Sequence, residues 1–228
     1  GRWRWKSTFS AHLQKDINNP FQGLPALEKA IGRKVVARIG SNESIGMPRH
    51  PLAEVLPGDL VDLCRLYPDP YSRDLRTKLA KLAPGAVEDA AHVLLDSGGD
   101  SLIFLTLRTR IVPGDCVITS RGTYPTFNYF CQGLGAEIVE VPYSDDGATC
   151  LRPDLAGLAA AAHSKKAALV YLANPDNPTG YVFRPEEVAK LREQLPPDTT
   201  LIVDEAYIDF SPENALCERL HNTVQIRT

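Results

Sequence analysis

The sequence predicts an α/β fold in which a mostly parallel β-sheet is covered by helices on both faces, making three layers. Short apolar runs alternate with segments of helical periodicity from residue 93 to the last residue. That alternation is typical of parallel strands joined by crossover helices. Loops rich in glycine, proline and asparagine follow several of the apolar runs. Open α/β sheets bind ligands beyond the carboxyl ends of their strands, so these loops are where a site is expected.

Composition sets the class of protein. The chain has 228 residues, of which 43% are hydrophobic and 23% charged, enough for a sizeable core. The formal net charge is -3 with no long run of one sign, so we expect no nucleic-acid or membrane partner. No stretch approaches the ~18 consecutive apolar residues of a membrane span. The five cysteines are widely spaced and include no Cys-x-x-Cys pair, which indicates a reducing, cytoplasmic compartment and no structural metal.

The chain is expected to divide near residue 50. Residues 1–50 are irregular and should form an N-terminal arm with part of a small domain, and residues 51–228 should form the large domain. Residues 52–66 have helical spacing. The Tyr-Pro-Asp-Pro sequence at 67–70 should be a rigid turn, because proline fixes its own φ and restricts the preceding residue. Residues 71–82 then predict an amphipathic helix.

The remaining elements follow from the alternation. Helices are expected at residues 102–111, 123–134, 151–162 and 185–195. Strands are expected at residues 93–95, 116–119, 137–141, 167–172, 200–203 and 221–227. Pro185 near the first position of its helix, with Glu186 and Glu187 in the first turn, suits a helix N-terminus.

Three loops that follow expected strands carry candidate chemistry. The first is Ser97-Gly98-Gly99-Asp100-Ser101, which opens a helix. Glycines let the backbone approach an anion closely, and the free N–H groups of the first helical turn can donate to it. The same composition also fits a plain strand-to-helix connection.

The second loop is Asn-Pro-Asp-Asn-Pro-Thr-Gly at residues 174–180. Two X-Pro steps and a glycine make a rigid turn that fixes the amide of Asn177 at the end of a strand. An amide held there can donate to a phenolate-type oxygen, and the alternative is a purely structural turn.

The third loop begins at Asp204 and reaches Tyr207. A carboxylate at a buried strand end is costly unless it is paired. Pairing with a protonated pyridine nitrogen would keep that ring cationic, and a cationic pyridine is an electron sink for a carbanion. The alternatives are a magnesium ligand of nucleotide-binding proteins or a helix N-cap, and no Gly-x-x-x-x-Gly-Lys-Ser/Thr sequence is present to support a nucleotide.

These motifs, in this order and spacing, resemble the large domain of fold-type-I pyridoxal-phosphate enzymes. Among them the chain is most similar to the histidinol-phosphate aminotransferases, through Tyr-Pro-Asp-Pro at 67–70, Pro-Gly-Asp at 113–115 and Asp-Glu-Ala-Tyr-Ile-Asp-Phe at 204–210. The resemblance implies the cofactor pyridoxal 5'-phosphate. It implies contacts from Gly99, Asp100 and Ser101 to the phosphate, Tyr124 to the ring face, Asn177 and Tyr207 to the phenolic oxygen, and Asp204 to the ring nitrogen.

The resemblance also implies a homodimer, in which Tyr67 contacts the phosphate of the partner's cofactor. In the family a strand ending Arg-Thr leads within a few residues to the lysine that forms the Schiff base. This chain ends at Arg227-Thr228, so that lysine is expected beyond it, and the chain alone is expected to be inactive. Lys165, Lys166 and Lys190 are expected to be solvated charges.

The implied activity is transfer of an amino group between an amino acid, or an amino-alcohol phosphate such as histidinol phosphate, and a 2-oxo acid. Asp204 and Tyr207 are the catalytic candidates within the chain. Two alternatives are a decarboxylase or lyase of the same fold, and an inactive truncated relative that acts as a binding module. Codons for Ser-Lys after Thr228 would exclude the module.

Overall fold

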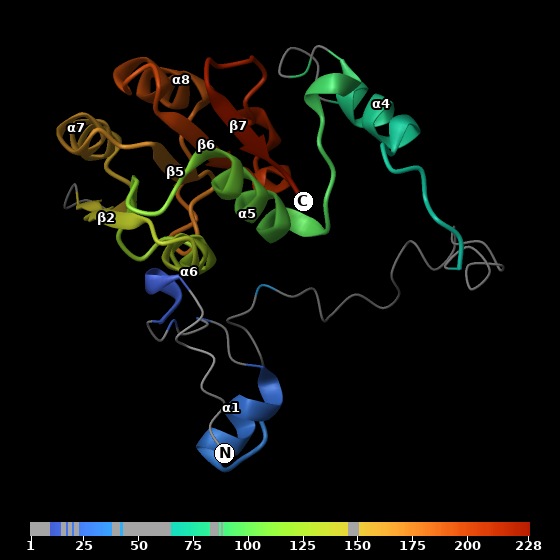
Figure 1. Cartoon of the computed structure of the whole chain (residues 1–228), viewed down its shortest axis with the longest axis vertical. Coiled ribbons are helices and arrows are strands. Elements are labelled where there is room, and N and C mark those ends of the chain that lie inside the picture. The colour runs from blue at the N-terminus through green and yellow to red at the C-terminus, as the bar shows by residue number, and fades with distance from the viewer. Residues whose placement is uncertain are drawn as a thin grey trace. The chain divides into compact units, whose positions relative to one another are not determined.

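Residues 116–228 contain the five strands of the main sheet, and every strand pair in it is parallel. The computed structural model describes residues 10–14, 17, 20, 23–37, 42, 65–82, 87, 89–145 and 151–228. The strand order is β2-β1-β5-β6-β7 (Figure 1). The strands are β1 (Cys116–Ser120), β2 (Glu137–Val141), β5 (Leu169–Ala173), β6 (Thr200–Asp204) and β7 (Thr223–Ile226).

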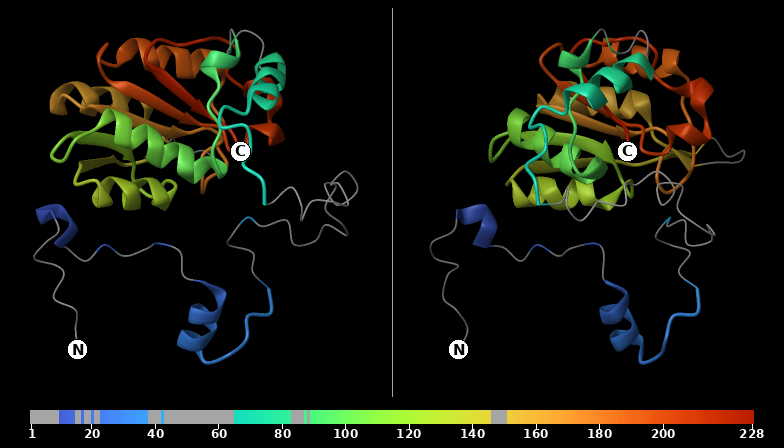
Figure 2. Two further views of the ribbon diagram at one scale, coloured as in Figure 1. Left: turned by 45° about the vertical axis from the view of Figure 1, so that its right-hand side comes forward. Right: turned by 90° about the vertical axis from the view of Figure 1, so that its right-hand side faces the viewer.

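Helices cover both faces of this sheet, as the sequence predicted (Figure 2). One face carries α5 (Gly98–Arg110) and α6 (Pro125–Gly133), and the other carries α7 (Leu155–Lys165) and α8 (Pro185–Gln194). Strand residues alternate between the two cores because successive side chains point to opposite faces. In β5, Tyr171 joins the core under α5 and α6, whereas Leu172 joins the core under α7 and α8.

The chain reverses its direction of progress across the sheet between β1 and β5. From β1 it passes through α6 to β2 on one side, and then through α7 to β5 on the other side of β1. At such a switch point the loops after two neighbouring strands diverge and leave a crevice, which is where open α/β sheets bind ligands. The loops after β1 and β5 contain Tyr124 and Asn177.

Most expected elements are confirmed, with small shifts at their ends. Three expectations were wrong. Residues 93–96 form no strand, and α5 begins at Gly98, four residues earlier than residue 102. Residues 151–162 do not form one helix, because Leu151–Arg152 forms β4, which pairs antiparallel with β3 (Ser144–Asp145). The Asp154 side chain then caps the start of α7 by accepting from the Gly157 N–H at 3.0 Å.

The N-terminal residues add short helices. They are η2 (Ala11–Gln14), α1 (Leu24–Ile31) and α4 (Arg73–Leu82), followed by η3 (Ala90–His92). The helix expected over 71–82 is confirmed and is preceded by the expected turn, in which the Asp69 carboxylate accepts from the N–H groups of Tyr71 and Arg73. The helix expected over 52–66 lies almost wholly outside the described residues.

Two compact units divide the chain, one of residues 1–20 and 75–228 and the other of residues 21–74. The boundary expected at residue 50 falls outside the described residues and stays a prediction. None of the helices in the described part of the chain is long and apolar enough to cross a bilayer.

Candidate functional site

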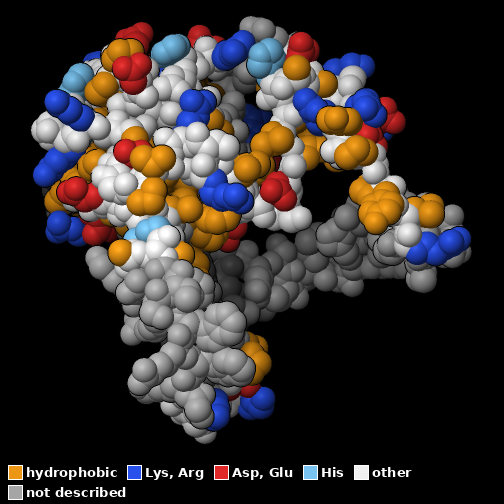
Figure 3. Space-filling view, viewed as in Figure 1, with side chains coloured by type: hydrophobic (Ala, Val, Ile, Leu, Met, Phe, Trp, Pro, Cys, Tyr) orange, Lys and Arg blue, Asp and Glu red, His pale blue; other side chains and the backbone are white. Residues whose placement is uncertain are grey.

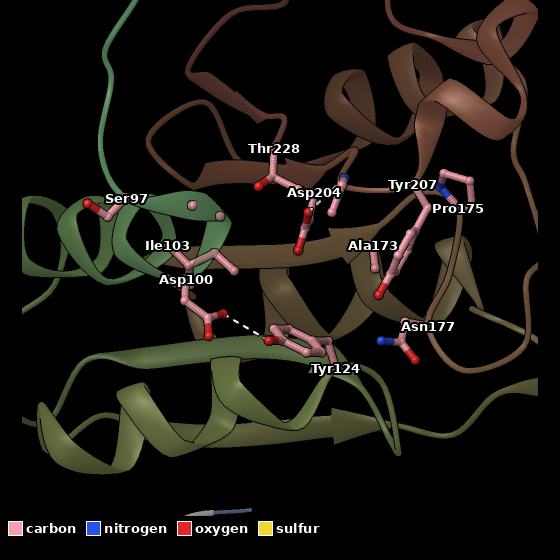
Figure 4. A pocket seen from close by; sticks show the side chains of 13 residues that line it. Ser97, Asp100, Ile103, Tyr124, Ala173, Pro175, Asn177, Asp204, Tyr207 and Thr228 are labelled. Atoms are coloured by element: carbon pink, nitrogen blue, oxygen red, sulfur yellow. Dashed lines mark hydrogen bonds between the residues drawn. The ribbon is translucent and has the colours of Figure 1, made fainter. Parts of the chain in front are cut away.

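A pocket of about 330 Å³ opens at the carboxyl ends of β5 and β6, on the face of the sheet that α5 and α6 cover (Figure 4). This volume suits a small ligand. The pocket is lined by Ser97, Gly98, Gly99, Asp100, Ile103, Tyr124, Ala173, Pro175, Asn177, Asp204, Ala206, Tyr207 and Thr228. The three loops singled out in the sequence therefore meet at one place.

The N-terminus of α5 forms one end of the pocket. Its first turn has backbone N–H groups without partners in the helix, and the Ser97 side chain does not cap them. Gly98 has a φ of 83°, in the left-handed region where a side chain is strained. A helix N-terminus left open in this way favours a bound anion.

Tyr124 lies across the pocket from this helix end, immediately before α6. Its hydroxyl donates to Asp100 Oδ1 at 2.9 Å, so the Asp100 carboxylate is turned toward Tyr124. Burial, with a smaller contribution from Asp100, raises the pKa of Tyr124 to about 12. Tyr124 therefore stays a neutral hydrogen-bond donor across the physiological range.

The loop at residues 174–180 is fixed by its own side chains. Asn174 is buried, and its amide oxygen accepts from the Phe183 N–H at 2.8 Å while its amide nitrogen donates to the Phe183 carbonyl at 3.1 Å. Both X-Pro bonds, before Pro175 and Pro178, are cis. Asn177 is left to face the pocket, as Figure 4 shows.

Asp176, between the two asparagines, ties this loop to its neighbours. It is 3% exposed and accepts from the Thr179 hydroxyl at 2.7 Å, from the Thr179 N–H at 3.2 Å and from the Thr123 hydroxyl at 3.3 Å. The Tyr143 hydroxyl donates to it at 3.1 Å. Asp176 thus links the loop that carries Asn177 to the loop that carries Tyr124.

Asp204 ends β6 and is 7% exposed, so its charge is largely removed from water. The Tyr171 hydroxyl donates to Oδ2 at 2.6 Å, and the Ala206 N–H donates to Oδ1 at 3.1 Å. Burial raises the pKa of Asp204 above its ordinary value, and these two hydrogen bonds oppose that rise. No cation among the described residues pairs with it, so the carboxylate is available to a cationic ligand.

Glu205 fixes the end of β7 beside the pocket. It is 1% exposed, and its carboxylate accepts from Arg227 Nε at 2.9 Å and from the Leu216 N–H at 2.9 Å. Its own N–H donates to the Ile226 carbonyl at 2.8 Å. These bonds hold Thr228 at the pocket wall.

Six of the eight residues predicted to bind a cofactor line the pocket: Gly99, Asp100, Tyr124, Asn177, Asp204 and Tyr207. Ser101 and Tyr67 do not. The Ser101 hydroxyl donates to the Ser97 carbonyl at 3.1 Å, and Tyr67 is fully exposed. Within the described residues, no group of three or more potential metal ligands comes together.

The sequence analysis did not identify Tyr171 and Asp176, two side chains that support the pocket through hydrogen bonds to its residues and loops. Tyr171 was hidden in an apolar strand, and its signal is that it shares a sheet face with Asp204. Asp176 was passed over as a loop residue between two prolines. A carboxylate in a loop at the end of a buried strand needs hydrogen-bond donors, and that need was the available signal.

Comparisons with known proteins agree on one family. The profile described as aminotransferase class I and II matches residues 60–226. A histidinol-phosphate aminotransferase of Staphylococcus aureus is 29% identical over 197 residues, which are 84% of this chain and 53% of that protein. Histidinol-phosphate aminotransferase 3 of Rhizobium meliloti is 32% identical over 176 residues, 77% of this chain and 45% of that protein.

Solved structures agree with the sequence comparisons. The crystal structure of histidinol-phosphate aminotransferase from Sinorhizobium meliloti in complex with pyridoxal-5'-phosphate has a TM-score of 0.81 and 37% identity. The superposed region covers 97% of this chain and 58% of the Sinorhizobium meliloti chain. The chain thus spans about half the length of the curated relatives it matches.

Proposed function

The chain belongs to the class I and II aminotransferase family, and we propose that the protein containing it is a pyridoxal-5'-phosphate-dependent aminotransferase. It would transfer an amino group between an amino acid, or an amino-alcohol phosphate such as histidinol phosphate, and a 2-oxo acid. One observation carries the proposal. A single pocket combines an open helix N-terminus, a tyrosine ring, an amide and a buried carboxylate that no cation among the described residues pairs with.

The donors of the pocket fit the phosphate end of this cofactor. The N–H groups of Gly99 and Asp100, at the open end of α5, would hold the phosphate. A methyl group added at Gly99 would meet only ordinary contacts with Ile226 and Thr228 at 3.8 Å and 3.9 Å, so there is room beside the backbone. The Ser101 hydroxyl is engaged with Ser97, which favours a contact through backbone rather than hydroxyl.

The remaining side chains fit the ring. Tyr124 would lie against its face, and Asn177 and Tyr207 would donate to its phenolic oxygen. Asp204 would hold a proton on the ring nitrogen, because the ion pair compensates the burial that raises the pKa of its carboxyl group. The cofactor itself supplies the electron sink for amino-acid chemistry. Asp204 would maintain that sink by keeping the nitrogen cationic.

The group that would move the proton at the substrate carbon is a lysine. None of the described lining residues is a lysine, and Lys165, Lys166 and Lys190 are not among them. In the family the lysine follows a strand ending in Arg-Thr. Thr228 lies at the pocket wall, where the bond from Arg227 to Glu205 holds it.

A homodimer is part of the proposal, with Tyr67 contributing to the partner's site. Leu75 and Leu82 of α4 are both exposed. Figure 3 shows apolar and basic side chains together over α4. Such a surface suits association with another protein surface.

We further propose histidine biosynthesis as the role and the cytoplasm as the location. The names of the relatives support the first. The thiols of Cys116, Cys131 and Cys217 are free, which supports a reducing compartment.

The test uses the protein encoded by the complete reading frame around this chain, supplied with histidinol phosphate and a 2-oxo acid. The proposal predicts formation of the corresponding amino acid without release of carbon dioxide. Release of carbon dioxide from an amino acid supplied in place of histidinol phosphate, or an elimination product, would favour the decarboxylase or lyase. Absence of any turnover, together with no binding of pyridoxal phosphate, would refute the proposal.

A further inference from the structure

Tyr171 lies behind the pocket and contacts its central carboxylate. Its side chain is buried, with 1% exposure, and its hydroxyl is 2.6 Å from Asp204 Oδ2. It is not one of the residues that line the pocket. Asp204 therefore has one face toward the pocket and one oxygen occupied from within the core.

The sheet register brings the two side chains together. Tyr171 pairs with Ile202, and Ala173 pairs with Asp204, so Tyr171 and Asp204 are diagonal neighbours on adjacent strands and on one face. Diagonal neighbours in a sheet are within reach of an aromatic side chain. The Tyr171 ring stacks on Phe127, with centroids 4.3 Å apart and planes inclined by 16°. This stacking holds the hydroxyl toward Asp204.

We propose that Tyr171 is a positioning residue that keeps Asp204 ionised, so that the carboxylate can receive a cationic pyridine ring. The inference rests on the proposed function, since it assigns the ring nitrogen to Asp204. Donation of the O–H to Oδ2 stabilises the negative charge and fixes the plane of the carboxylate. The ionised carboxylate is then held at the pocket wall in a fixed orientation.

The groups around Asp204 make this contribution necessary. Burial raises the pKa of Asp204, and the negative charges of Asp100 from α5 and of Glu205, the residue after β6, raise it further. The Tyr171 hydroxyl and the Ala206 N–H are the donors that lower it. The hydroxyl of Tyr124, the residue before α6, also faces this cluster and donates to Asp100. Without Tyr171, a single N–H would oppose all the effects that favour the neutral acid.

Tyr171 itself remains a donor at every working pH. Burial, followed by the charge of Asp204, raises the pKa of Tyr171 well above its ordinary value. Its proton is therefore not lost to the carboxylate. A purely structural role, filling the core beside Phe127, is the alternative, and Tyr171→Phe separates the two because phenylalanine keeps the ring.

The experiment measures the affinity of the chain for pyridoxamine 5'-phosphate between pH 4 and 8. This probe has a cationic ring and needs no lysine. Affinity should fall at low pH as Asp204 takes up a proton, and we call this fall the acid limb of the pH profile. Asp204→Asn should bind the probe weakly at every pH and should show no acid limb. In Tyr171→Phe the acid limb should move up by about one pH unit, the equivalent of a hydrogen bond to a charged group. Circular dichroism verifies folding at each pH.

Tyr181→Phe is the matched control. It removes a half-buried phenol hydroxyl whose partner is Arg152, at 3.1 Å, and it should leave the acid limb where the wild type has it. If Tyr171→Phe does not fold, 3-fluorotyrosine introduced at position 171 provides the test. Its hydroxyl is a stronger hydrogen-bond donor, so the acid limb should move to lower pH.

The outcomes separate the inference from the proposed function. An acid limb that is unchanged in Tyr171→Phe, or unchanged or raised with 3-fluorotyrosine, overturns the role of Tyr171. Failure of the wild type to bind the probe, or full binding by Asp204→Asn, overturns the proposed function instead.

Discussion

Replacing Asp176 with alanine should damage both the stability of the chain and its affinity for the cofactor. Asp176 accepts from three hydroxyl groups and one N–H, with separations from 2.7 Å to 3.3 Å. At about 1 kcal/mol for each hydrogen bond, their loss costs about 4 kcal/mol. Removing the buried carboxylate also removes its desolvation cost, which offsets this loss by about 1–2 kcal/mol. The expected net loss in the free energy of unfolding is therefore about 2–3 kcal/mol.

The same change should weaken binding at the pocket, because Asp176 fixes the neighbouring Asn177. Affinity for pyridoxamine 5'-phosphate should fall about tenfold, the equivalent of one hydrogen bond to the phenolic oxygen. Asp154→Ala is the control. It removes the cap of α7 outside the pocket, and should cost about 1 kcal/mol of stability without changing affinity. Urea unfolding gives the first quantity and calorimetric titration the second.

Two results would refute this reasoning. An Asp176→Ala chain within about 0.5 kcal/mol of the wild type would mean that water replaces the lost acceptor, since surface positions behave that way. A stability loss with unchanged affinity, as expected for Asp154→Ala, would mean that Asp176 does not position Asn177.

Three further perturbations test other parts of the site by urea unfolding of the unliganded chain. Asp204→Asn should be more stable than the wild type at pH 7, with the difference shrinking toward pH 4. Burial raises the folded-state pKa of Asp204, so the stability this group contributes is present below its unfolded pKa of about 3.9 and is lost as pH rises through the folded value; a pH-independent difference would contradict this. Gly98→Ala should cost about 1–2 kcal/mol because its φ is 83°, whereas no cost would mean that the backbone relaxes. Arg227→Ala should lower the free energy of unfolding by about 1–2 kcal/mol, because it leaves the buried Glu205 without its cation. The Arg227 side chain is 37% exposed, and solvent screening there limits the loss. An unchanged stability would show that the hydrogen bonds from Gln225 and the Leu216 N–H are enough to satisfy the Glu205 carboxylate.

The sequence was informative where local chemistry decides the structure. The apolar run at 200–203 predicted β6 to within one residue, because both faces of a parallel sheet are buried. The loops after β5 and β6 were recognisable because each combines residue types that a simple turn does not need. Their convergence on one pocket followed from the rule that parallel strands end at the same edge.

Other features depend on contacts that no local pattern contains. The start of α7 at Leu155 depends on Asp154 as its cap, which the alanine-rich run concealed. Residues 93–95 are apolar but form no strand, and no strand in the described part of the chain pairs with them. The bond from Tyr171 to Asp204 joins residues separated by 33 positions and requires the register of two strands.

The most direct test of the account is a crystal structure of the chain with pyridoxamine 5'-phosphate. The phosphate should lie at the N-terminus of α5, against the N–H groups of Gly99 and Asp100, and the ring nitrogen should lie within hydrogen-bonding distance of Asp204. A cofactor bound in the opposite orientation, or bound away from Asp204, would contradict it.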